Sequence, residues 1–200
     1  MTARWPPDGL VRAVRDAAKG SGWTAWSGTL SRVDDGMAYH VSEFAQHIRF
    51  YAKPAAWDDW VWRLLEVETA RRRSPSAHFR GVHARVPAVA RCAVTARAPA
   101  DIAAEILAFG EAELQRAEPD RLGDFPDLLR RDVDRTGRDD FAVTEVVWHL
   151  AEGRPGAARD IAEAVAGGTR RPSFLVHATR DGAPFSFFEA VLAETARAGG

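Results

Sequence analysis

The stretch "DDGMAYHVSEFAQHIRFYAKP", residues 34–54, decides the fold expected for this chain. Its Asp35-Gly36 pair is a hairpin signal, because glycine adopts positive φ without a steric cost. Aromatic and β-branched residues on both sides of the pair alternate with polar ones, which is typical of half-buried strands. The predicted strands span 24–33, 37–44 and 47–53.

The alternation changes phase inside this stretch. The large apolar residues Met37, Tyr39 and Val41 are odd-numbered. Phe44, Ile48 and Phe50 are even-numbered. Side chains of a strand alternate between faces with a period of two, so an uninterrupted strand would place these groups on opposite faces. We therefore predict a turn or bulge near residues 42–46 that resets the register.

A helix is expected directly after the strands. Pro54 excludes Lys53 from the helical region and ends the strand. Over 56–70 the apolar residues fall at i, i+3, i+4, i+7 and i+8, which makes one helical stripe that we expect to pack on the sheet. Asp58 and Asp59 lie in its first turn, where negative charge favours the helix dipole. The stripe consists of Trp57, Trp60, Val61, Leu64 and Leu65.

Two residues do not fit the pattern of one apolar stripe. Trp62 projects away from it, which suits a pocket, a protein interface or ordinary packing. Glu68 projects into it and, if buried, needs a partner or a raised pKa; otherwise it lies beyond the edge of the core. We predict a candidate binding cleft between helix and sheet. It is bordered by Lys53, Asp58, Asp59, Trp62 and Glu68, with Tyr39, Tyr51, Trp23 or Trp26 from the strands.

The remaining pattern completes an α+β fold with a mostly antiparallel sheet of about five strands. Helices at 9–19, 56–70 and 100–116 are expected to cover one face of the sheet. Further strands are predicted over 82–86 and 91–96, and residues 173–179 are predicted as a strand or a short helix, with the strand preferred. Further helices are predicted over 126–135, 143–151, 156–166 and 186–197. The expected organisation is a sheet region, 1–118, and a helical C-terminal region, 119–200, packed as one unit because no flexible linker separates them.

One segment carries a resemblance. "VTEVVWHLAEGRPGAARDIAEAVA", residues 143–166, resembles a helical hairpin of the kind found in tetratricopeptide-like repeats, with small residues where two helices meet. Stacked arrays need about three such units, and the resemblance covers one. It therefore implies a helical hairpin and not a repeat protein.

Composition narrows the classes of function. The net charge of −1 gives no general attraction to nucleic acid or to a membrane surface, so we expect neither as a partner. Cys92 has no second cysteine to pair with, and no apolar run has the length of a signal peptide or a membrane span. We therefore expect a soluble cytoplasmic protein. Of the 27 basic residues, Lys19 and Lys53 are lysines and the rest arginines, which suggests a GC-rich bacterial genome.

Metal binding has two weak candidates. His40, Glu43 and His47 have ligand-like spacing, but they lie on predicted strands and a turn instead of one helix face. Glu145 and His149 stand at i and i+4 of a predicted helix and therefore point the same way. Such pairs are common on charged helices, so we predict no metal site and no cofactor.

Catalytic signals are sparse. His78 and His83 lie in a polar loop and titrate near neutral pH, so acid–base chemistry would use them with Asp58 or Glu68. No nucleophile elbow or phosphate-binding loop motif is present, although residues 167–170 have the composition to hold an anion. Cys92, in an apolar strand-like run, is typical of inert packing.

Two hypotheses of function follow. The first is a non-enzymatic binding protein, of the accessory, antitoxin or immunity type, which presents an aromatic surface around Trp62 to a protein partner. The alternative is a small-molecule hydrolase that uses His78 or His83 with a carboxylate in a cleft. The sequence does not decide between an enzyme and a binding protein, and it does not indicate an oligomeric state.

Overall fold

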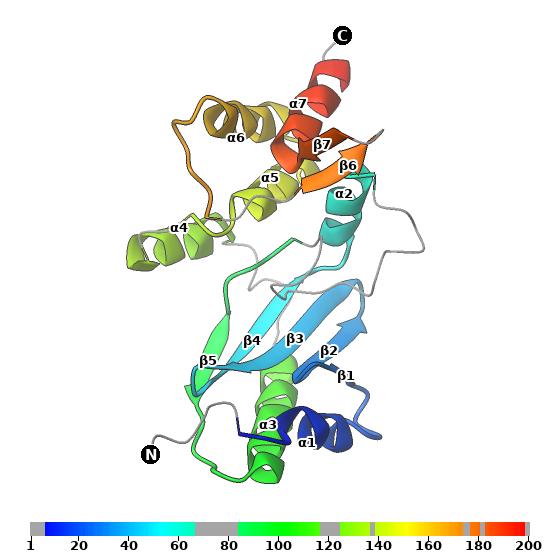
Figure 1. Ribbon diagram of the computed structural model, residues 1–200, viewed down its shortest axis with the longest axis vertical. Coiled ribbons are helices and arrows are strands. Elements are labelled where there is room, and N and C mark those ends of the chain that lie inside the picture. The colour runs from blue at the N-terminus through cyan, green and yellow to red at the C-terminus, as the bar shows by residue number, and fades with distance from the viewer. Residues whose placement is uncertain are drawn as a thin grey trace. The chain divides into compact units, whose positions relative to one another are not determined.

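The computed structural model confirms the α+β class, with a five-stranded antiparallel sheet and helices at the C-terminus (Figure 1). It describes residues 7–66, 84–116, 125–136, 139–173, 177–180 and 183–198. The chain forms two compact units. The first comprises Met1–Pro54 and Ala88–Gly123, and the second comprises Ala55–Pro87 and Asp124–Gly200.

The first unit contains the sheet, whose strands are neighbours in the order β1-β2-β3-β4-β5. Each strand runs antiparallel to the next. Helices α1 and α3 pack on each other and on one face of this sheet (Figure 1). Its elements are α1 (Leu10–Ala17), β1 (Thr24–Trp26), β2 (Thr29–Asp34), β3 (Met37–Phe44), β4 (His47–Pro54), β5 (Ala90–Ala93) and α3 (Pro99–Arg116).

Two-residue turns join the first four strands. Their central residues all have positive φ, as type I′ hairpin turns require. The predicted hairpin at Asp35-Gly36 is confirmed, with φ values of 44° and 75°. The prediction of a continuous strand over 24–33 is wrong, because Ser27 and Gly28 form a turn of the same kind between β1 and β2.

The third turn confirms the predicted change of register and corrects one residue. Ala45 and Gln46 have φ values of 52° and 66°, and Phe44 pairs directly with His47. The change of face therefore falls after Phe44. Phe44 is 54% exposed and lies on the face opposite Ile48, so the prediction that the two share a face is wrong.

The strand predicted over 91–96 is present as β5, whereas the one predicted over 82–86 is not found in residues 84–86, the part that the structure describes. In its described part, Ala84 to Val86, the chain has no strand pairing. Thr144 Oγ1 instead donates to the carbonyl oxygen of Arg85. The amide of Ala84 is likewise bound by a side chain, since it donates to Asp58 Oδ1 at 2.8 Å.

Buried apolar residues on alternate strand positions form the core of the first unit against α1 and α3. The sheet contributes Leu30, Val41, Ile48, Phe50 and Ala52, and the helices contribute Leu10, Val14, Ile102, Ala103 and Ile106. We call this side of the sheet the core face. Trp23 completes it, with its indole N–H donating to Glu111 Oε1 at 2.8 Å.

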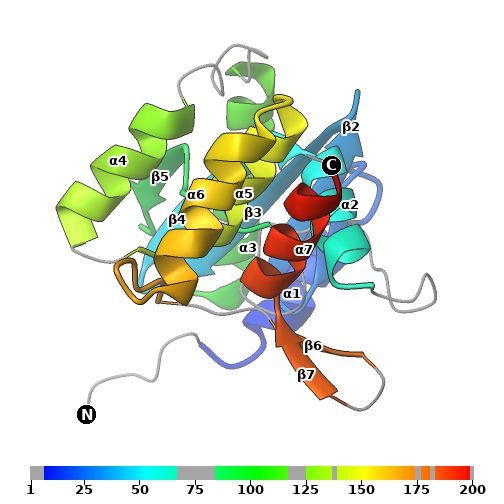
Figure 2. The same ribbon diagram turned by 90° about the horizontal axis from the view of Figure 1, so that it is seen from above.

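The second unit is mainly helical. Helix α6 packs beside both α5 and α7 (Figure 2), and the strands β6 and β7 form a separate hairpin. The predicted hairpin of helices over 143–166 is confirmed, with small buried residues, Ala158 and Ala162, on α6. The elements are α2 (Ala56–Leu64), α4 (Phe125–Thr136), α5 (Ala142–Ala151), α6 (Pro155–Ala166), β6 (His177–Arg180), β7 (Ala183–Ser186) and α7 (Phe187–Ala198).

Helix α2 is confirmed as a helix, and it belongs to the second unit. It contacts α5 and α7 of the second unit, and the Trp57 ring meets Phe125 edge-on at 4.7 Å between centroids. Trp62, predicted to project outward, is 6% exposed, whereas Trp60 is half-buried beneath the Arg63 guanidinium at 3.8 Å. A helix that contacts two other helices buries a wider surface than one apolar stripe, so a residue outside the predicted stripe, such as Trp62, can also be buried.

The close approach of α3 to the sheet requires a glycine. A Cβ on Gly110 would lie 2.8 Å from Val41 Cγ2 and 3.4 Å from Trp23 Cζ2. Val41 is fully buried and β-branched, so its side chain has little freedom to yield.

We therefore predict that Gly110→Ala lowers the free energy of unfolding by about 1 to 3 kcal/mol, although alanine is the better helix former. Urea denaturation measures this change. Gly156→Ala is the matched control, because nothing lies within 4 Å of the added Cβ in α6. An equal or greater stability for Gly110→Ala would contradict the close packing of α3 on β3.

Candidate functional site

The side of the sheet opposite the core face has a distinct chemical character, and we call it the polar face. Its strand residues are Thr24, Trp26, Thr29, Ser31, Val33, Ala38, His40, Ser42, Phe44, His47, Arg49, Tyr51, Lys53, Arg91 and Ala93. None of these strand residues is acidic, whereas Arg49, Lys53 and Arg91 are basic. The accessible charges on these strand residues, those of Arg49 and Arg91, are therefore positive.

One row of paired residues crosses all five strands of the polar face. Trp26 pairs with Thr29, Thr29 with Ser42, Ser42 with Arg49, and Arg49 with Arg91. We call these residues the cross-strand row. Directly paired residues lie on one face of a sheet, and neighbouring strands are about 4.8 Å apart, so the row extends about 19 Å.

The two ends of the cross-strand row are accessible. Trp26 is 53% exposed, and Arg91 is exposed on β5. Thr29 and Ser42, with small hydroxyl side chains, are buried between Trp26 and Arg49. The row thus offers an apolar group at one end and cationic groups at the other.

The cationic end is organised by an aromatic ring. The Arg49 guanidinium lies over the Phe44 ring, 4.7 Å from its centroid. Stacking occupies one face of a guanidinium but leaves the N–H groups along its edge available for a carboxylate. Within the described part of the chain, neither Arg49 nor Arg91 forms an ion pair.

The centre of the polar face is buried. His40 is 1% exposed, and its Nδ1 lies 3.0 Å from Ser31 Oγ on the neighbouring strand. Tyr51 pairs with His40 on the other side, and Lys53 is fully buried near the end of β4. The Ser31–His40 contact is a hydrogen bond that satisfies the Nδ1 atom of this buried imidazole.

His40, Glu43 and His47 have ligand-like spacing in the sequence, but their side chains do not lie on one face of the sheet. The two histidines are on the polar face, whereas Glu43 is on the core face. There Glu43 Oε1 accepts the backbone N–H of Gln46 at 2.7 Å and stabilises the turn. Among the described residues, no group of three histidine, cysteine or acidic side chains is placed to hold a metal ion.

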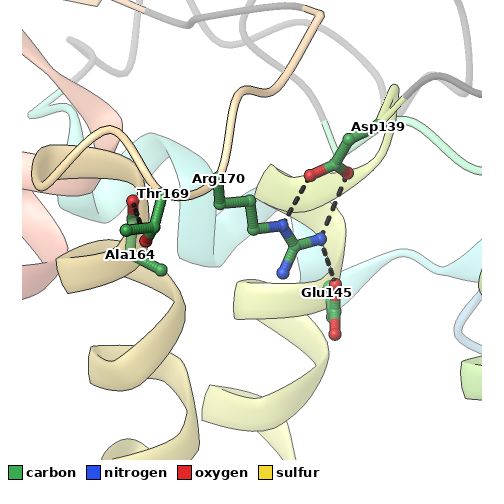
Figure 3. Close-up of polar contacts among 5 residues, drawn as sticks. All are labelled: Asp139, Glu145, Ala164, Thr169 and Arg170. Atoms are coloured by element: carbon green, nitrogen blue, oxygen red, sulfur yellow. Dashed lines mark hydrogen bonds and ion pairs between the residues drawn. The ribbon is translucent and has the colours of Figure 1, made fainter.

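A separate charged cluster lies in the second unit (Figure 3). Arg170, in the segment after α6, donates from Nε to Asp139 Oδ2 at 2.5 Å and from Nη2 to Asp139 Oδ1 at 3.1 Å. Its Nη2 also donates to Glu145 Oε2 at 2.6 Å. Burial disfavours the guanidinium charge, but the hydrogen bonds to the two carboxylates outweigh it and raise the pKa of Arg170.

These contacts bear on two of the predicted sites. Residues 167–170 were predicted to be able to hold an anion, but Arg170 already binds the carboxylates of Asp139 and Glu145 (Figure 3). In the same segment, Thr169 Oγ1 donates to the Ala164 carbonyl at 3.0 Å. Glu145 is likewise committed to Arg170 instead of pairing with His149.

His149 is the unsatisfied member of this neighbourhood. Its Nδ1 is buried and has no hydrogen-bond partner among the described residues, and its ring lies 4.7 Å from that of Trp148. Burial lowers the pKa of His149, and the positive charges of Arg154 and Arg170 lower it further against the opposing effect of Glu145. His149 is therefore held in its neutral form.

The predicted binding residues do not form one site within either unit. Asp58 is buried and accepts the amide of Ala84, and Asp59 is exposed. The predicted cleft would join Lys53 of the first unit to α2 of the second, so neither unit by itself contains it. Glu68, His78 and His83 lie outside the described residues.

Phe44 and Arg49 were not among the candidate binding residues predicted from the sequence. Two signals were available for them: the alternation of β3 and β4, and the position of a two-residue turn between them. Together they place Phe44 and Arg49 on one face. Cys92, in contrast, faces the core as expected, and burial, with smaller contributions from Glu105 and Glu113, raises the pKa of its thiol.

Comparison with known proteins found no matching family model, no matching curated protein and no matching solved structure. Within the described ranges, no helix has the length and apolar character needed to cross a membrane. The candidate site therefore rests on the geometry of this chain alone.

We predict that Arg170→Met lowers the free energy of unfolding by about 2 kcal/mol, because it leaves two half-buried carboxylates without their charged donor. Chemical denaturation measures the loss. Arg159→Met is the control, since its pair with Glu163 on α6 is half-exposed and contributes less than about 0.5 kcal/mol. Equal effects of the two variants would contradict a structural role for the cluster.

We also predict that His149 makes stability fall on acidification. Its folded pKa is below the unfolded value of about 6.5, so its contribution is complete above that pH and is lost as pH falls through the folded pKa. Denaturation at pH 7.5 and 5.5 should show a smaller loss for His149→Phe, which keeps a ring beside Trp148, than for the wild type. Identical losses would refute this assignment.

Proposed function

We propose that the chain is a non-enzymatic binding protein that engages a protein partner through the cross-strand row and Phe44 on the polar face. The observation that supports this proposal most strongly is the exposure of two large aromatic side chains on the same face of one sheet, Trp26 at 53% and Phe44 at 54%. Exposed aromatic side chains beside arginine are enriched at the centres of protein interfaces.

The proposal keeps the class of function expected from the sequence and moves its site. Trp62 is buried, so it does not supply the exposed aromatic group that the hypothesis required. Trp26 does, and it lies on a short edge strand supported by the rest of the sheet. A rigid sheet holds such a side chain with little loss of conformational freedom on binding.

A protein partner suits this face better than a small molecule. The accessible groups, Trp26, Phe44, Arg49 and Arg91, are spread over several strands instead of converging on one point. Small ligands are usually enclosed in concave sites, whereas protein partners cover extended surfaces. The hydrolase alternative depends on His78 or His83 with Asp58 or Glu68. Of these four residues only Asp58 is described, and it is buried and accepts the amide of Ala84.

Partner binding tests this proposal. Proteins retained by the immobilised chain are identified by mass spectrometry, purified and titrated calorimetrically against wild type, Trp26→Ala and Phe44→Ala. We expect each variant to bind about tenfold more weakly or worse, since exposed aromatic anchors dominate interface energies.

Val11→Ala is the matched control, because Val11 is also a large exposed apolar residue, at 45%, but belongs to α1. It should bind as the wild type does. A purified partner whose affinity is unchanged by both aromatic substitutions would contradict the proposed site, and so would the absence of any partner that binds after purification.

A further inference from the structure

We infer that the partner presents an extended acidic segment that crosses the strands along the cross-strand row, with an apolar residue at Trp26 and carboxylates at Arg49 and Arg91. This inference rests on the proposed function and adds the chemistry of what is bound. It follows from the pairing of the two arginines, their lack of acidic partners, and the spacing of the row.

The arginine pair is the first observation. Arg49 and Arg91 are direct cross-strand partners, a placement in which like charges repel. No strand residue on the polar face is acidic, and neither arginine has an ion pair in the described structure. A bound carboxylate would relieve this repulsion and would form charge-assisted hydrogen bonds with the guanidinium edges.

The surroundings reinforce the preference for an anion. His47 is exposed on the same face and pairs with Phe44, beside Arg49. The Phe44 ring beneath Arg49 fixes the plane of the guanidinium and limits its rearrangement. A pre-oriented guanidinium favours the planar, two-pronged contact that a carboxylate makes.

The spacing of the row fits an extended peptide. From Trp26 the row reaches Arg49 after three strand steps, about 14 Å, and Arg91 after four, about 19 Å. In an extended peptide, residues 1, 5 and 7 face one side and lie about 13 Å and 20 Å apart along the chain. The structure thus favours the pattern apolar-x3-acid-x-acid, contacted at Trp26, Arg49 and Arg91. Thr29 and Ser42, which lie between them, are buried and offer little surface to the segment.

A protein segment is favoured over single-stranded nucleic acid, the other ligand that combines negative charge with stacking groups. The row has one exposed aromatic end and one cationic end, whereas a nucleic acid strand repeats charge and base at every nucleotide. The net charge of −1 also gives no long-range attraction for a polyanion.

Synthetic peptides test the inference on the full chain. The probe is the blocked peptide Leu-Ser-Ser-Ser-Glu-Ser-Glu, used in both chain directions. Its first control carries glutamine for glutamate, and its second moves the glutamates to positions 4 and 6. Titrations are followed by NMR of the Trp26 indole N–H. We expect the probe to bind about tenfold or more tightly than either control, and less tightly as salt rises.

Substitutions in the protein give the complementary test. Arg49→Gln and Arg91→Gln should each weaken probe binding about tenfold, and Arg49→Glu combined with Arg91→Glu should prefer the lysine version of the probe. Arg12→Gln, on a nearly fully exposed side chain of α1, is the control and should leave probe binding unchanged. Circular dichroism checks that each variant is folded.

The outcomes separate this inference from the proposed function. If a purified partner needs Trp26 and Phe44 but binds Arg49→Gln and Arg91→Gln at full strength, the acidic-segment inference is wrong and the binding function stands. Equal binding of the glutamate and glutamine peptides would also overturn the inference. So would tighter binding of an eight-residue oligo-thymidine than of the acidic probe.

Discussion

The structure depends above all on the register of the antiparallel strands. Each of the first three hairpins closes through two residues with positive φ, which fixes which residues stand opposite each other. Because strand side chains alternate with a period of two, a slip of one residue would expose Val41 and Phe50 and bury Arg49. The turns therefore determine both what forms the core and what faces a partner.

The same constraint separates two kinds of chemistry on one sheet. The core face is apolar and is filled by α1 and α3, down to a close approach at Gly110. The polar face collects hydroxyl, imidazole, guanidinium and ammonium groups without a strand carboxylate. The core face thus stabilises the fold, whereas the polar face keeps Trp26, Phe44 and Arg91 exposed beside a buried centre.

The sequence predicted local structure well where a short-range signal existed. The Asp35-Gly36 turn, the reset near residues 42–46 and most helices follow from turn chemistry and periodicity. The Ser27-Gly28 pair is also a turn signal, and without it β1 and β2 are predicted as one strand. Errors of this kind are local and correctable.

The errors about tertiary contacts have a different cause. The stripe on α2 was identified, but a stripe does not state which element will cover it. Helix α2 contacts two helices of the second unit, and Trp62, predicted to project outward, is buried. The cross-strand row was equally hidden, since Arg91 reaches it from a strand distant in sequence.

The most direct test of this account is the pairing of Arg49. Cross-strand NOEs between backbone protons should connect Thr29 with Ser42, Ser42 with Arg49, and Arg49 with Arg91. That result would place both arginines on the face that carries Trp26. NOEs that connect Arg49 with Ala90 or Cys92 instead would shift the register by one residue, separate the two guanidinium groups onto opposite faces, and contradict the account.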